Sequence, residues 1–142
     1  MPIPKVYLIR VYYEDNVGNP QTCLKLGRTK QPLHERVVEF LRKMRVATGY
    51  KVKQYEVISI LNSSNSIVIE FALHQNVEHL YFYTDSGLRR SFQGSNELLR
   101  DTAENSNVLR NPDSWYREGE YVVPYNFRET QRSAYGSVSN VV

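Results

Sequence analysis

Two strand-like runs on either side of a turn-forming segment constrain this chain more than any other feature of its sequence. Residues 5–13 are rich in β-branched and aromatic side chains. Residues 22–27 alternate, with Leu24 and Leu26 on one side and Cys23, Lys25 and Gly27 on the other. The intervening residues 15–20 are nearly all turn formers. We therefore expect an antiparallel β-hairpin at the start of the chain.

A helix is predicted directly after this hairpin. Thr29 is a suitable N-cap, Pro32 suits a first helical turn, and Gly49 marks the end. The apolar residues of this segment recur at three- and four-residue spacing: Leu33, Val37, Phe40, Leu41 and Met44. This spacing predicts an amphipathic helix with one face against the sheet.

The rest of the chain adds a strand and two helices to this prediction. Residues 52–60 favour a third strand, and the polar residues 62–66 open a second helix that runs to about Leu80. The predicted core residues of that helix are Ile67, Val68, Phe71, Leu73 and Val77. Ser95 is expected to cap a third, short helix. We therefore predict an α+β fold, with helices flanking a small, three-stranded, mainly antiparallel sheet.

Length and composition limit the classes of protein that this chain can belong to. A chain of 142 residues fits one main domain, which we place at residues 1–103, followed by an irregular extension over residues 104–142. The single cysteine, Cys23, excludes an intrachain disulfide and a cysteine-rich metal site. The sequence has no apolar signal-peptide core and no apolar run of about 18 residues. We expect an intracellular protein that is neither secreted nor inserted in a membrane.

The positive charge of the chain is concentrated in its first 60 residues. Eleven Lys and Arg face five Asp and Glu there, which gives +6, whereas the remaining residues carry −3. A basic region of this kind favours an anionic partner such as nucleic acid. The alternative is a solvated surface without a partner.

Four sequence features fall in a consistent order along the predicted elements. Val6-Tyr7-Leu8-Ile9 lies in the first strand, and Leu24-Lys25-Leu26-Gly27-Arg28-Thr29 ends the second. Arg36 lies in the helix that follows and Glu70 in the next helix. In this arrangement residues 5–100 resemble a GIY-YIG nuclease domain. The resemblance is closest to a branch common in phages and other viruses, whose second motif contains Lys-Ile-Gly-Arg-Thr.

The resemblance implies roles for four residues in phosphodiester hydrolysis. Glu70 would hold a single Mg²⁺ or Mn²⁺, and Tyr7 would act as general base or orient the attacking water. Arg36 would bind the scissile phosphate, while Lys25 stands where the family has its second tyrosine. The residues alone leave alternatives open: a surface role for Glu70, an ordinary sheet tyrosine at Tyr7, and an ion pair of Arg36 with Glu39.

Five further residues are expected to bind the substrate: Gly27, Arg28, Lys30, His34 and Asn96. Gly27 would allow a phosphate or a backbone to approach the end of the strand closely. Asn96 is a candidate for the asparagine that the family often carries near the end of the module, and the adjacent Glu97 is an equal candidate. His34 would approach the site as a proton shuttle or as a hydrogen-bond donor to the phosphate, or else simply lie in solvent.

Taken together, the resemblance implies a divalent-metal-dependent endonuclease that hydrolyses DNA phosphodiester bonds, with RNA left open as a substrate. One alternative is a nucleic-acid-binding module that keeps the fold without catalysis. Another is a protein-interaction domain whose basic surface is incidental. Cleavage of both strands at one place would require a homodimer or a second protein.

Overall fold

The computed structural model describes residues 3–110 and 128–130 of the chain. Their elements follow in this order: β1 (Lys5–Glu14), β2 (Pro20–Thr29), α1 (Leu33–Thr48), β3 (Lys51–Asn62), α2 (Ser66–His74), β4 (Leu98–Leu99), α3 (Ala103–Ser106) and β5 (Arg128–Thr130). Two single-turn 3₁₀ helices, η1 (Ser95–Glu97) and η2 (Val108–Arg110), lie before β4 and after α3.

The sheet is antiparallel and has β1 at its centre. β1 pairs with β2 over its whole length and with β3 on its other side, so the predicted hairpin and the α+β class are confirmed. The predicted count of three strands is too low, because the strand order is β4-β2-β1-β3-β5. Leu98 and Leu99, expected to lie in a third helix after Ser95, instead pair with Lys25 and Leu24 as β4.

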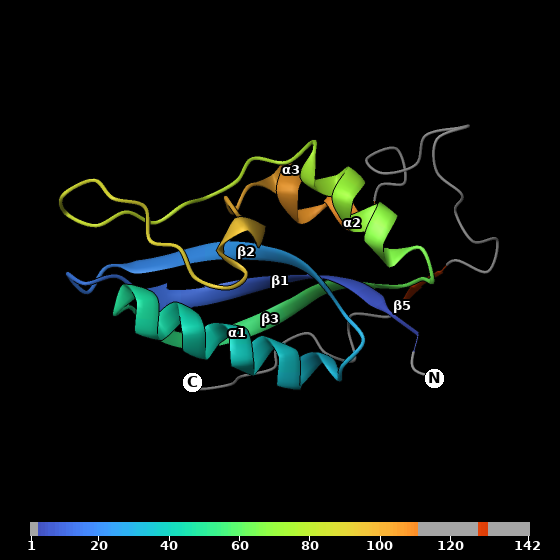
Figure 1. Cartoon of the computed structure of the whole chain (residues 1–142), viewed down its shortest axis with the longest axis horizontal. Coiled ribbons are helices and arrows are strands. Elements are labelled where there is room, and N and C mark those ends of the chain that lie inside the picture. Colours follow the sequence, from blue (N-terminus) through green and yellow to red (C-terminus); the bar gives the residue numbers. More distant parts are fainter. Residues whose placement is uncertain (1–2, 111–127, 131–142) are drawn as a thin grey trace.

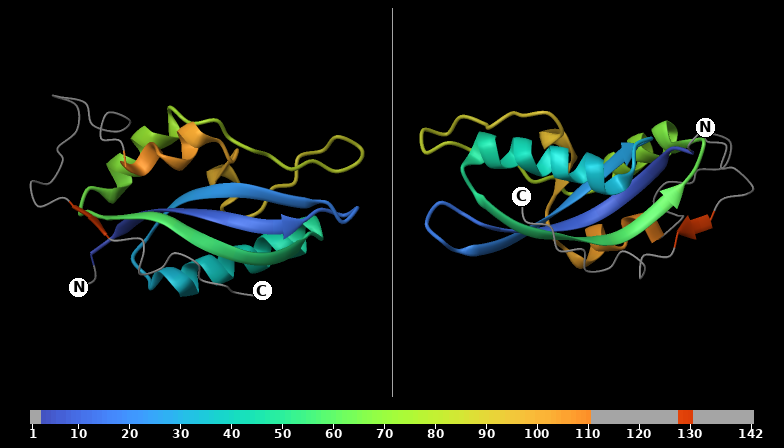
Figure 2. Two further views of the ribbon diagram at one scale, coloured as in Figure 1. Left: turned by 180° about the vertical axis from the view of Figure 1, so that it is seen from behind. Right: turned by 90° about the horizontal axis from the view of Figure 1, so that it is seen from below.

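Helices cover both faces of the sheet, as Figures 1 and 2 show. Alternate residues of β1 point to opposite faces. Tyr7 and Ile9 join the core under α1, whereas Val6 and Leu8 join the core under α2 and η2. A functional residue on β1 therefore belongs to one face or the other according to its position in the strand.

Helix α1 matches its sequence pattern closely. All five of its predicted core residues are buried, and the helix ends at Gly49, whose φ of 77° is the left-handed conformation that favours glycine at a helix end. The predicted N-cap is wrong, since Thr29 is the last residue of β2 and Pro32 occupies the cap position.

Helix α2 is shorter than predicted and is turned differently. It ends at His74 and packs against the sheet through Ile69, Ala72 and Leu73. Ile67 and Phe71, two of its predicted core residues, are 65% and 62% exposed. Ile67 and Phe71 are four residues apart and share one side of the helix, whereas Ile69 and Leu73 share the side that faces the sheet.

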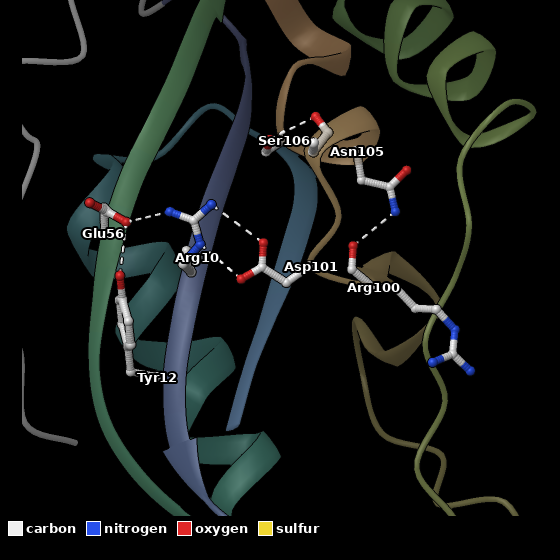
Figure 3. A network of polar contacts seen from close by, with 8 residues as sticks. Arg10, Tyr12, Glu56, Arg100, Asp101, Asn105 and Ser106 are labelled. Atoms are coloured by element: carbon white, nitrogen blue, oxygen red, sulfur yellow. Dashed lines mark hydrogen bonds and ion pairs between the residues drawn. The ribbon is translucent and has the colours of Figure 1, made fainter. Parts of the chain in front are cut away.

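The segment after β4 is fastened to the sheet by charged groups (Figure 3). Arg10 of β1 donates from Nε and Nη2 to Asp101, at 2.9 and 3.3 Å, and from Nη1 to Glu56 of β3 at 2.7 Å. Tyr12 donates its hydroxyl to the same Glu56 oxygen at 3.1 Å. We call these four residues the Arg10 network.

Residues 104–110 continue this packed structure beyond the boundary placed at residue 103. Val108 and Leu109 are buried against the α2 side of the sheet. Apart from β5, the remainder of the expected C-terminal extension lies outside the described residues. Within the described part of the chain, no helix combines the length and apolar character needed to cross a bilayer.

Candidate functional site

The candidate site lies where β4 ends and leaves the outer edge of β2 uncovered. β4 pairs only with Leu24 and Lys25, so α2 reaches the next part of this edge. His74 of α2 contacts the main-chain oxygen of Leu26 at 2.9 Å from its Nε2. Gly27 follows directly and forms the floor of the site.

Gly27 is required because the ring of Tyr7 lies across it. Tyr7 and Gly27 face each other in the β1–β2 ladder, and a Cβ at Gly27 would lie 2.6 Å from the Tyr7 hydroxyl oxygen and 2.7 Å from its Cζ. The group that lies close to Gly27 is therefore the phenol of Tyr7, where the sequence led us to expect a phosphate or a backbone segment. The hydroxyl is buried and makes no hydrogen bond of ordinary geometry among the described residues, although the ammonium of Lys25 lies close enough to act on it.

Lys25 brings a positive charge into this buried space. Its side chain has no exposed area, and its Nζ forms an ion pair with Glu97 of η1. The ammonium also lies 4.4 Å from the centre of the Phe40 ring and 5.3 Å from that of Tyr7. A buried lysine requires such partners, because an ammonium without them is costly to desolvate.

Glu70 brings a second carboxylate to the site from α2. Its Oε2 is buried without a hydrogen-bond partner among the described residues, and His74 Nε2 lies 3.8 Å from it. Burial and the neighbouring Glu97 raise the pKa of Glu70 to about 7, although Lys25 and Arg28 act in the opposite direction. Glu70 therefore lies close enough to the Lys25–Glu97 pair for each charge to affect the others.

The hydrogen bonds of His74 fix its tautomer. A carbonyl only accepts, so Nε2 must carry the proton that is donated to Leu26. Nδ1 then accepts from Nε2 of His79, which lies 2.9 Å away. Burial lowers the pKa of both imidazoles, which keeps them neutral.

The structure also alters the role expected for Tyr7. Burial raises the pKa of its phenol, and the positive charges of Lys25 and Arg36 do not offset this effect. The field of Lys25 is itself opposed by Glu97. The phenol is therefore protonated near neutral pH, where it can donate a hydrogen bond but cannot serve as a ready general base.

Two arginines flank the site. Arg28, one residue beyond Gly27, donates from Nε to the Ser66 hydroxyl at 2.8 Å and so ties the end of β2 to the first turn of α2. Arg36 of α1 lies 3.6 Å from Glu39 and is 17% exposed, yet its charge still acts on the phenol of Tyr7. Arg36 therefore makes the contact with Glu39 that the sequence allows and also lies close enough to the site to act on Tyr7.

Three of the predicted substrate-binding residues do not join this group. His34 is bonded to the Tyr55 hydroxyl of β3 at 2.7 Å. Asn96 is exposed and accepts a hydrogen bond from Arg89, while its neighbour Glu97 points to Lys25. Lys30 is exposed just past the end of β2.

The sequence names Glu97 only as an equal candidate beside Asn96, and it gives no role to His74. A lysine on the buried face of a predicted strand signals that some carboxylate must lie nearby, but it does not say which one. His74 lies one helical turn beyond Glu70, which signals a shared face and little more.

The side chains that could bind a single divalent cation at this site are the carboxylates of Glu70 and Glu97. Among the described residues, no three acidic, histidine or cysteine side chains form a metal-binding group. A hard cation that keeps most of its waters needs only one or two carboxylates. The buried, unpartnered oxygen of Glu70 fits such a cation, with the Glu97 carboxylate close by.

Comparison with known proteins provides no family for this chain. No protein-family model, no curated protein and no solved structure matches it.

Proposed function

We propose that this protein is an endonuclease of the GIY-YIG type that hydrolyses DNA phosphodiester bonds with one divalent metal ion. One observation carries the proposal. Tyr7, Lys25, Glu97 and Glu70 come from four different elements and interact at the end of β2, and two of their buried oxygen atoms have no hydrogen-bond partner among the described residues. Unsatisfied buried polar groups are costly, and they concentrate at functional sites. We call these four residues the Tyr7 cluster.

Glu70 would hold Mg²⁺ or Mn²⁺, since its Oε2 is both buried and unpartnered. The ion, when bound, would supply positive charge that polarises the scissile phosphate and lowers the pKa of water. A cation at Glu70 would also remove the main cost of ionising that carboxyl group, which is burial.

The remaining residues would bind and orient the phosphate. Arg36 and Arg28 lie on two sides of the site, and a guanidinium can bind two phosphate oxygens at once. Tyr7, whose phenol stays protonated near neutral pH, would donate a hydrogen bond from its hydroxyl to a phosphate oxygen or to the attacking water and so orient it. Lys25 would hold Tyr7 and Glu97 in place rather than act as a base.

A non-catalytic nucleic-acid-binding module is the second candidate function. One observation favours it, because the family's second tyrosine is replaced by Lys25 and the ammonium is already paired with Glu97. Such a protein would retain the basic surface and the fold but not cleave. A protein-interaction domain, by contrast, would show no salt-sensitive binding to DNA at all.

Nicking of supercoiled plasmid by the full-length protein separates these functions. We expect open-circular product with Mg²⁺ or Mn²⁺ and none with EDTA. Glu70→Gln should remove the activity and leave DNA affinity unchanged, because the amide keeps the volume but loses the charge. Glu78→Gln is the matched control, since the Glu78 side chain is 64% exposed and pairs with Arg100 outside the site. Nicking that survives Glu70→Gln would contradict the proposal, and DNA binding without nicking would establish the second candidate.

A further inference from the structure

The chain between α2 and η1 carries a row of flat side chains that the site does not use. This segment runs along the outer edge of β4, where His79 pairs with Leu99, and then forms a loop that extends beyond the sheet (Figure 1). It is extended over residues 79–83, so its side chains alternate. Phe82 enters the core under α1, where it packs edge-on against Tyr13 and Tyr50.

The other side of the same segment presents three aromatic rings: His79, Tyr81 and Tyr83. The exposed fraction rises outward, from a half-buried His79 to 36% for Tyr81 and 55% for Tyr83. A solvated face of an extended segment normally carries polar side chains. Since Phe82 already anchors the segment, the outward rings have no evident part in holding the fold.

A guanidinium extends this row. Arg89 lies directly over the ring of Tyr81, with its Cζ 3.9 Å from the ring centre, and Asn96 accepts a hydrogen bond from it. Tyr83 and Arg89 pair across the loop as an isolated β-bridge. Tyr81, Tyr83 and Arg89 therefore form one exposed surface that is both aromatic and positively charged.

The row begins at the candidate site. The ring planes of His79 and Tyr81 are within 14° of each other, and those of His79 and His74 within 15°. Nε2 of His79 bonds Nδ1 of His74, and His74 lies 3.8 Å from Glu70. A strand whose phosphate lay at Glu70 would thus pass the partly buried imidazoles of His74 and His79 before it reached the exposed rings of Tyr81 and Tyr83.

We infer that Tyr81, Arg89 and Tyr83 form a stacking surface for the unpaired bases of a nucleic-acid strand next to the scissile phosphate. This inference rests on the proposed function, because the site at Glu70 defines where the strand begins. Aromatic rings and guanidinium planes are the groups on which unpaired bases stack, whereas the bases of an intact duplex are not available to them. The +6 charge of residues 1–60 favours the same polyanionic partner.

Fluorescence anisotropy in EDTA tests this surface without cleavage. A labelled single strand and a duplex of the same sequence are compared at low salt with the full-length protein. Tyr83→Ala should weaken single-strand binding about tenfold, as expected for one lost base–ring stack, and Tyr81→Ala should do the same because it removes the ring that supports the Arg89 plane on which a base would stack. Duplex affinity should change less than twofold, so the preference for the single strand should fall. Tyr83→Trp should restore the affinity, because the larger ring still stacks.

Phe71→Ala is the matched control, since Phe71 is an aromatic residue that is 62% exposed, against 55% for Tyr83, and lies on α2 outside the row. Equal losses on single strand and duplex, or no loss in either tyrosine variant, would overturn the inference. So would a loss of the same size in Phe71→Ala. Plasmid nicking with Mg²⁺, measured in parallel, decides the proposed function separately, because the anisotropy requires no catalysis.

Discussion

Strand β1 carries two polar clusters on its opposite faces, and they are built on different principles. In the Arg10 network, each guanidinium nitrogen meets a carboxylate oxygen, and Glu56 and Asp101 remain 31% and 20% exposed. In the Tyr7 cluster, one buried ammonium stands among two carboxylates and a phenol. Two oxygen atoms of this second cluster have no hydrogen-bond partner among the described residues.

The Arg10 network stabilises the fold, whereas the Tyr7 cluster contains groups that the rest of the fold must hold in an unfavourable state. Burial alone would lower the pKa of Arg10, but the hydrogen bonds and charges of Asp101 and Glu56 raise it, so pairing favours the charged form. In the Tyr7 cluster burial outweighs pairing. It is the largest cause of the raised pKa values of Tyr7 and Glu70, and it favours their neutral forms. Groups held in such an unfavourable state are the ones that a substrate or a cation would relieve.

The largest predicted effect compares Arg36, which flanks the Tyr7 cluster, with Arg10 of the Arg10 network. Arg36→Ala should lower plasmid nicking about a thousandfold and change stability little, because fixed positive charge matters most in the transition state. Arg10→Ala should leave the nicking rate intact and lower the free energy of unfolding by about 2 kcal/mol, because two carboxylates lose their partner. A less than tenfold loss of nicking in Arg36→Ala would return Arg36 to its surface pair with Glu39.

The second prediction concerns the two halves of the buried ion pair. Glu97→Gln should lower the free energy of unfolding by about 3 kcal/mol, because it removes the carboxylate that forms the ion pair with the buried ammonium of Lys25. Lys25→Met should cost less than about 1 kcal/mol, because the Glu97 side chain is 30% exposed and can turn to water. Urea denaturation measures both, and equal costs would show that Lys25 is not enclosed as described.

A third prediction follows from the raised pKa of Glu70, which is about 7. Between the ordinary carboxyl value of 4.5 and 7, the folded protein holds a proton that the unfolded chain has released. Stability should therefore fall as pH rises through this window, by about 2 kcal/mol relative to Glu70→Gln. The comparison is made in EDTA, and the opposite contribution of His74 and His79, whose pKa values are lowered, cancels between the two proteins. Parallel pH profiles would contradict the burial of Glu70.

Local periodicity explains why part of the fold could be predicted. The β1–β2 hairpin and α1 follow from alternation, turn residues and helical spacing, which are properties of short segments. Which face of α2 is buried depends on the partner that it meets, and Ile67 and Phe71 were therefore misplaced. β4 is only two residues long, so Leu98 and Leu99 carry no strand pattern of their own.

The candidate site shows the same limit. The resemblance to GIY-YIG nucleases groups Tyr7, Gly27 and Glu70; in the structure Tyr7 lies against Gly27, and Glu70 interacts with Lys25, Arg28 and Glu97. The partner of Lys25 could not be chosen from the sequence, because Glu97 is one of 15 acidic residues and lies 72 positions away. The protonation state of the Tyr7 phenol could not be predicted either, because it depends on burial and on the position of the Glu97 carboxylate in the fold.

The smallest predicted effect compares two tyrosines of the same strand. Tyr12 donates its hydroxyl to Glu56, so Tyr12→Phe should lower the free energy of unfolding by about 1 kcal/mol. The hydroxyl of Tyr7 is buried without a hydrogen-bond partner in the described structure, so Tyr7→Phe should leave stability unchanged or raise it slightly. Plasmid nicking should show the reverse order, with activity lost in Tyr7→Phe and kept in Tyr12→Phe. Urea denaturation and nicking of the two variants are measured side by side. If Tyr7→Phe instead loses stability and keeps activity, the hydroxyl holds the fold, and the contrast between the two faces of β1 fails at its central residue.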